Sequence, residues 1–132
     1  MYLSHLSIKI YNKKIMHYMK LNDKYYNLIK NGNKTIELRL YDDKRKLLKK
    51  NDKIQFKNRI NNEIIITVID DLIIFESFKN ALEGIDVEKC IPGSTLENAL
   101  KIYEEIYEEK YKINKVIAIF IRKVNLSKSY HK

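Results

Sequence analysis

The nine residues 32–40 constrain the fold of this chain more than any other stretch of its sequence. Gly32 can end a helix in the left-handed conformation, and the residues that follow alternate between polar and apolar as in a strand. On such a strand Glu37 and Arg39 share one face, while three aliphatic residues share the other. Lys34 stands at the entrance to the charged face. The pattern therefore predicts a helix, a stop at Gly32, and a strand with its charges gathered on one side.

Two cations and one carboxylate within six residues are costly to bury unless they pair with one another or with a ligand. Ordering around a ligand is one explanation, and a structural ion-pair network that serves the fold alone is another. We place the candidate site at Lys34, Glu37 and Arg39.

The length of 132 residues is that of one domain with one real hydrophobic core. No apolar run approaches the ~20 residues needed to span a bilayer, and the N-terminus has no convincing signal peptide. The single cysteine, Cys90, excludes an internal disulfide and a cysteine-based zinc site, and we expect it to be a half-buried thiol. His5, His17 and His131 lack metal-ligand spacing. We expect a cytoplasmic, monomeric protein without membrane contact, metal or cofactor.

The formal net charge of +9 is unevenly distributed along the chain. Residues 1–60 contain 16 Lys/Arg against 5 Asp/Glu, whereas residues 61–132 contain 10 against 12. All of the excess positive charge therefore lies in the half that carries the candidate site. An AT-rich genome would explain many lysines but not their gathering in one half. The asymmetry favours an anionic partner, and nucleic acid comes first.

Along the first half, residues 1–14 read as an added edge strand or a mobile arm, and 15–21 as a first strand. Asn22 or Asp23 can cap the helix that leads to Gly32. The basic run 44–50 fits a solvated helix face and a phosphate-contacting one equally well. A turn at Asn51 then leads into a strand over 53–57, and a second turn forms a hairpin.

In the second half, the β-branched run within 63–75 predicts a long or broken core strand. A short helix over 76–83, a loop over 84–93 and a capping box at Ser94 and Glu97 follow. The helix after the box carries a stripe that we interpret as core packing: Leu96, Ala99, Leu100, Tyr103, Ile106, Tyr107 and Tyr111. Residues 116–124 form a strand buried on both faces, and 127–132 a polar tail. The order of elements predicts an α+β fold, a compact mixed β-barrel flanked by helices, over residues 15–126.

Several of these segments together resemble the ASCH family. The string Gly32-Asn33-Lys34-Thr35-Ile36-Glu37-Leu38-Arg39, with Arg45 after it, matches the family pattern G-x-K-x-x-E-x-R. Asn51-Asp52-Lys53-Ile54-Gln55-Phe56 is similar to the family's G-D-x-I-x-F segment. Asn51 stands where the family usually has glycine, and Tyr111-Lys112-Ile113 replaces Tyr-Gly-Val. The resemblance covers about residues 15–124 and implies a PUA-like barrel, the fold of a group of RNA-binding domains.

The favoured function is an RNA- or nucleotide-binding module. Lys34 and Arg39 would meet phosphates or base edges, and Arg45 with the basic run would add non-specific phosphate contacts. Glu37 would accept from an exocyclic amine or hold Arg39 in place. If the family topology holds, His17 lies beside this strand and could stack on a base, although a half-buried structural histidine fits equally well.

The alternative is a hydrolase that uses the same cleft. Lys34 with a lowered pKa and Glu37 as general base could cleave RNA or hydrolyse an amide on a modified base. ASCH relatives that deacetylate N4-acetylcytidine have a threonine nucleophile three residues after the lysine. Glu37 occupies that place here, so the resemblance does not carry this activity over. A third hypothesis is a protein-interaction or regulatory domain.

Overall fold

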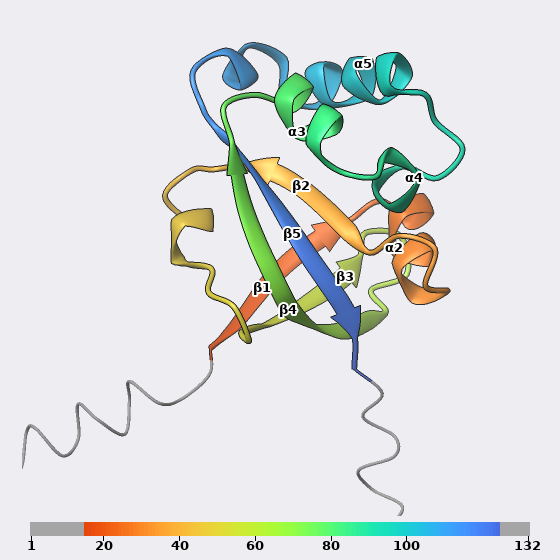
Figure 1. The fold of residues 1–132 in the computed structure, drawn as a ribbon. Helices are drawn as coiled ribbons and strands as arrows, with labels where there is room; N and C mark the ends of the chain where they lie inside the picture. The colour runs from red at the N-terminus through yellow and green to blue at the C-terminus, as the bar shows by residue number, and fades with distance from the viewer. Residues whose placement is uncertain (1–14, 125–132) are drawn as a thin grey trace, which may run out of the picture.

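The computed structural model describes residues 15–124 of the chain (Figure 1). The strands are β1 (Met16–Leu21), β2 (Ile36–Leu40), β3 (Lys53–Asn58), β4 (Ile64–Phe75) and β5 (Val116–Lys123). The helices are α2 (Asp23–Lys30), α3 (Phe78–Gly84), α4 (Val87–Cys90) and α5 (Leu96–Tyr107), with 3-10 turns η1 (Arg45–Leu47) and η2 (Glu108–Lys112). The predicted extension, 1–14, and tail, 127–132, lie outside the described residues.

The five strands form one mixed sheet in the order β1-β3-β4-β5-β2. β1 runs parallel to β3, and the other neighbours are antiparallel. The pairing of β4 with β5 shifts register between Ile69 and Asp71, and such irregularities increase local twist. The sheet curls into a half-barrel, and α3, α4 and α5 gather at one end of it (Figure 1). The predicted α+β class with a barrel-like mixed sheet and flanking helices is confirmed.

Two hydrophobic cores lie on opposite sides of β5. Val116 and Ala118 join a core with β2, α3, α4 and α5, whereas Ile117 and Ile119 join one with β1, α2 and β3. Because alternate side chains of a strand point to opposite faces, one strand supplies both cores. The prediction that this last strand is buried on both faces is confirmed from Val116 to Ile119, whereas Phe120 is half-buried and the strand's last two residues are exposed.

A glycine forms the turn before β2, and an asparagine forms the turn before β3. Gly32 follows α2 with a φ of +87°, and Asn51 precedes β3 with a φ of +76°. Only glycine enters this left-handed region freely, and asparagine tolerates it better than most residues. Both turn predictions are confirmed, and Asn51 thus fills the place of the expected glycine.

Other local predictions were wrong in detail. Asn22 precedes α2, but its side chain caps no backbone N–H. The cap of α5 is Thr95, whose hydroxyl accepts from the backbone N–H of Asn98, so the capping box predicted at Ser94 and Glu97 lies one residue too early. The loop predicted over 84–93 contains the short helix α4.

Burial also departs from the predictions in β4, α5 and α4. Only Thr67 and Ile69 of β4 are buried, while Ile65, Leu72 and Phe75 are half-buried and pack against the cores, so this long central strand belongs to the core only in part. The α5 stripe does pack into a core, except for the exposed Ile106. Cys90 is fully rather than half buried, and its Sγ lies 3.0 Å from the hydroxyl of Tyr103. None of the helices within residues 15–124 is long and apolar enough to cross a membrane.

Candidate functional site

Three charged side chains of the motif, Lys34, Glu37 and Arg39, form one chain of contacts that we call the buried triad. Nζ of Lys34 lies 3.1 Å from Oε1 of Glu37, and Nε of Arg39 donates to Oε2 of Glu37 at 2.7 Å. The strand alternation places Glu37 and Arg39 on one face of β2, as the sequence predicted. Lys34 lies between the turn at Gly32 and the start of β2, and its ammonium group contacts Glu37 from there.

Lys34 is the most enclosed member of the triad, with its side chain only 1% exposed. Besides the contact with Glu37, its ammonium group donates to the carbonyls of Ile36, at 2.7 Å, and Cys90, at 2.8 Å. An ammonium group has three hydrogens to donate, and these three acceptors use all of them. Lys34 therefore ties β2 to the end of α4 and holds Glu37, and it has no hydrogen left for a ligand.

Glu37 is held in its ionised form by its neighbours. Burial by itself would raise its pKa, but the charges of Lys34 and Arg39 and their hydrogen bonds hold that pKa below the ordinary value of a glutamate. A carboxylate with a depressed pKa is a weak general base at neutral pH but a permanent hydrogen-bond acceptor. The arrangement therefore suits recognition better than proton abstraction.

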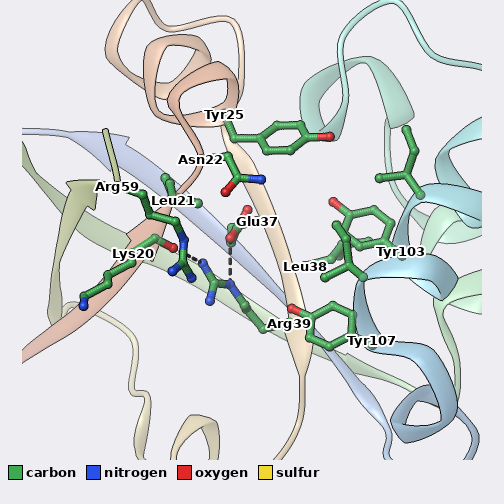
Figure 2. Close-up of a pocket in the computed structure, with 12 residues that line it drawn as sticks. Lys20, Leu21, Asn22, Tyr25, Glu37, Leu38, Arg39, Arg59, Tyr103 and Tyr107 are labelled. Atoms are coloured by element: carbon green, nitrogen blue, oxygen red, sulfur yellow. Dashed lines mark hydrogen bonds and ion pairs between the residues drawn. The ribbon is translucent and has the colours of Figure 1, made fainter. Parts of the chain in front are cut away.

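Arg39 connects the two edges of the curled sheet. Its Nη2 donates to the backbone carbonyl of Lys20 on β1 at 3.1 Å, while its Nε donates to Glu37 on β2 (Figure 2). Burial would lower its pKa, but the carboxylate of Glu37 raises it, so the guanidinium stays charged. Arg39 thus bridges the open side of the half-barrel with a fixed cation.

A cavity of about 290 Å³ opens over Glu37 and Arg39, and we call it the triad pocket. It lies between β2, the start of α2 and α5, and Figure 2 shows three tyrosines around it. The lining residues are Lys20, Leu21, Asn22, Tyr25, Glu37, Leu38, Arg39, Arg59, Ile102, Tyr103, Ile106 and Tyr107. Burial raises the pKa of Tyr103 well above its ordinary value, and burial raises that of Tyr107, so both hydroxyls are neutral at neutral pH.

The structure brings some of the predicted site residues together and separates others. Glu37 and Arg39 line the triad pocket. Lys34 lies outside its described lining and contacts Glu37. Arg45 lies in a neighbouring groove, where its Nη1 donates to Asp42 at 3.0 Å. His17 is absent from the described lining of both cavities, and its Nε2 lies 2.8 Å from Oδ2 of Asp52. His17 lies on β1, whose neighbour in the sheet is β3, and its part in nucleic-acid binding stays a prediction.

Sequence reasoning missed the aromatic and cationic walls of the triad pocket. Tyr103 and Tyr107 were assigned to the core, and they do pack on Phe78 with ring centroids 4.9 and 5.3 Å away. The signal was the residue type: tyrosine, unlike leucine, brings a hydroxyl that needs a polar partner. Lys20 and Arg59 carried no signal, because only the curl of the sheet brings them to Arg39. Within residues 15–124 no cluster of His, Cys, Asp or Glu could hold a metal ion.

The fold and the site define a class of small α+β domain. In it, a charged pocket lined by tyrosines lies between the edge of a curled mixed sheet and a covering helix. Residues 19–126 match the family model described as ASCH domain, so the chain belongs to the ASCH domain family.

Solved structures support this assignment. The crystal structure of hypothetical protein PH0355 is 34% identical with a TM-score of 0.75, over 83% of this chain and 100% of that one. The solution NMR structure of protein PF0455 from Pyrococcus furiosus is 30% identical with a TM-score of 0.65, over 84% and 99%. The crystal structure of ASCH from Zymomonas mobilis, 16% identical with a TM-score of 0.61 over 87% and 76%, shares the fold. The comparison with curated proteins finds no match.

Proposed function

We propose that this protein binds RNA or nucleotides and that the triad pocket receives a base. The observation that carries the proposal is the pairing, within one cavity, of a fixed carboxylate and guanidinium with the rings of Tyr25, Tyr103 and Tyr107. The cavity of about 290 Å³ lies near the lower end of small-ligand sites, which begin at roughly 300 Å³. The ASCH domain family, to which this chain belongs, is generally thought to bind RNA.

The chemistry of the pocket matches the edges and faces of a base. Glu37 offers a carboxylate to an exocyclic amine or a ring N–H, and Arg39 offers N–H donors to carbonyl and ring-nitrogen acceptors. Aromatic rings stack on the faces of unpaired bases. Lys20 and Arg59 at the rim add positive charge where a phosphate would leave the pocket.

The hydrolase alternative is less well supported by the geometry. This alternative requires Lys34 to act as a reactive amine and Glu37 to act as a general base. Lys34 donates to three protein acceptors, and the pKa of Glu37 is lowered rather than raised toward neutrality. A general base works best with a pKa near the operating pH. Binding is therefore the function we propose.

The test is a fluorescence titration with labelled single-stranded and hairpin RNA, followed by a gel that checks RNA length. The informative variant is Ile106→Glu, because Ile106 lines the pocket yet is 54% exposed, so a carboxylate there repels RNA without opening the core. The matched control is Ile113→Glu, at a position that is 85% exposed and outside the described pocket lining. We expect Ile106→Glu to weaken binding at least about tenfold, a change of ~1.4 kcal/mol, and Ile113→Glu to have little effect.

A second arm tests the placement of His17. We expect His17→Gln to bind RNA as tightly as the wild type, because His17 contacts Asp52 rather than the pocket. Equal binding by Ile106→Glu and the wild type would refute the pocket as the site. RNA shortened during the titration would instead establish a ribonuclease.

A further inference from the structure

A second cavity adjoins the triad pocket and shares three of its cations. This basic groove, of about 450 Å³, lies along β1 and β3 beside the η1 turn. Lys20, Arg39 and Arg59 line both cavities, and the groove adds Tyr18, Met19, Lys44, Arg45, Gln55 and Lys57. None of its described lining residues is acidic. The groove therefore continues directly from the mouth of the pocket with positive charge only.

Most of these cations have no partner within the described part of the protein. Arg39 pairs with Glu37 and Arg45 with Asp42, but no ion pair among residues 15–124 involves Lys20, Lys44, Lys57 or Arg59. Lys20 and Lys57 are also register partners on adjacent strands. Like charges placed directly opposite one another destabilise a sheet, so the protein bears a cost that an anion in the groove would offset.

An exposed aromatic ring stands among these cations. Tyr18 is 59% exposed and lies on the same face of β1 as Lys20, two residues away, which is about 6.6 Å along a strand. Its register partner is Gln55, another residue of the groove. A ring beside a track of cations is the arrangement that holds single strands, since bases stack on the ring while phosphates meet the charges.

We propose that the basic groove carries the backbone of a single-stranded nucleic acid away from the triad pocket, with a base stacked on Tyr18. This inference rests on the proposed function and adds the class of ligand, which is a strand of several nucleotides rather than a free nucleotide. The strand must be single, because a base enters the pocket only when it is unstacked and unpaired. The groove then supplies affinity, and the pocket supplies the choice of base.

The experiment compares a nucleoside monophosphate with a single-stranded oligonucleotide of about eight nucleotides, a length within the range held by other single-strand sites. The groove variant is Lys44→Gln with Lys57→Gln, which leaves every residue of the triad pocket in place. We expect it to bind the oligonucleotide more weakly and to reduce the slope of log K against log salt by about 1.4, at about 0.7 for each lost phosphate contact. Its affinity for the monophosphate, followed by NMR titration, should not change.

Tyr18 is tested separately from charge. We expect Tyr18→Ala to weaken oligonucleotide binding about tenfold without a change in the salt slope, and Tyr18→Phe, which keeps the ring, to restore it. Because the side chain is largely exposed, either substitution should preserve the fold, and thermal unfolding checks this. A heparin titration serves as the comparison with a polyanion that has no bases.

The outcomes separate the two proposals. If the groove variant binds the oligonucleotide as the wild type does while Ile106→Glu loses it, the groove inference is overturned and the proposed function stands. If Ile106→Glu keeps full affinity and the groove variant loses it, the pocket proposal fails, the path from the pocket fails with it, and only nucleic-acid contact by the groove is supported. Equal binding of heparin and oligonucleotide, with Tyr18→Ala unchanged, would overturn the single-strand path in favour of a general polyanion surface.

Discussion

Lys34 and Lys57 both belong to the basic N-terminal half, but the fold places their ammonium groups in opposite situations. Lys34 is buried, and three protein acceptors receive its hydrogens. Lys57 lies on the solvent side of β3 opposite Lys20 and has no ion-pair partner among the described residues. Lys34 therefore stabilises the fold, whereas Lys57 lies beside Lys20, and a bound anion would offset the repulsion between these two charges.

The difference shows that a charged motif and a ligand-contacting surface need not coincide. In this protein Lys34 of the motif serves to fix Glu37, which with Arg39 faces the pocket. The cations without an ion pair among residues 15–124 lie elsewhere: Lys20 and Lys57 on β1 and β3, Arg59 just after β3, and Lys44 in the basic run 44–50. Ligand contacts are therefore better sought among the charges that the fold leaves unpaired.

The largest effect should follow from removing the buried cation. Lys34→Met keeps the length of the side chain but leaves Glu37 with one partner fewer and two carbonyls without a donor. Breaking one partner of a buried ion pair costs about 3–5 kcal/mol, and we expect a loss of that size in the free energy of unfolding measured in urea.

The matched control is the same substitution at a groove cation. Lys44→Met should change the free energy of unfolding by less than about 0.5 kcal/mol, because Lys44 is exposed and has no ion pair among the described residues. Its effect should appear in RNA affinity instead. Similar stability losses in the two variants would contradict the distinction between the buried triad and the basic groove.

The next effect concerns the ionisation of Glu37. Its folded pKa lies below the ordinary value of a glutamate: burial opposes this shift, and Lys34 and Arg39 outweigh it. The unfolded chain thus takes up a proton first, so this contribution is complete above the ordinary pKa and is lost as pH falls through the folded one. At neutral pH we expect Glu37→Gln to cost about 1.5–3 kcal/mol, the worth of a hydrogen bond to a charged group.

The measurement is urea unfolding of the wild type and Glu37→Gln from neutral to acid pH. The difference between them should narrow as the pH falls, because protonation of Glu37 removes the charge that the substitution removes. Glu105→Gln is the control, since Glu105 is exposed on α5. A difference that stays constant over the whole range would show that the charge of Glu37 contributes nothing to stability.

Much of the fold could be predicted because it depends on local patterns. The left-handed turns at Gly32 and Asn51 and the alternation in β2 need only the conformational preferences of neighbouring residues. The contact of Arg39 with the carbonyl of Lys20 could not be predicted, since it depends on how far a five-stranded sheet curls. The contact of His17 with Asp52 could not be predicted for the same reason, because it depends on how the strands are arranged in space.

The smallest expected effect is also the sharpest test, because it requires stability and affinity to move in opposite directions. Lys57→Gln removes the repulsion between Lys57 and Lys20 across β3 and β1, and should stabilise the unliganded protein by a few tenths of a kcal/mol, about the size of one cross-strand pair. The same substitution should weaken binding of single-stranded RNA and lower its salt dependence. High salt should abolish the stability gain, since screening removes the repulsion in the wild type as well.

Lys53→Gln serves as the control, because Lys53 pairs in register with Met16 and lies outside the described groove lining. A loss of stability in Lys57→Gln at low salt would mean that Lys57 has a partner within the protein, and its positive charge would no longer be available to a ligand.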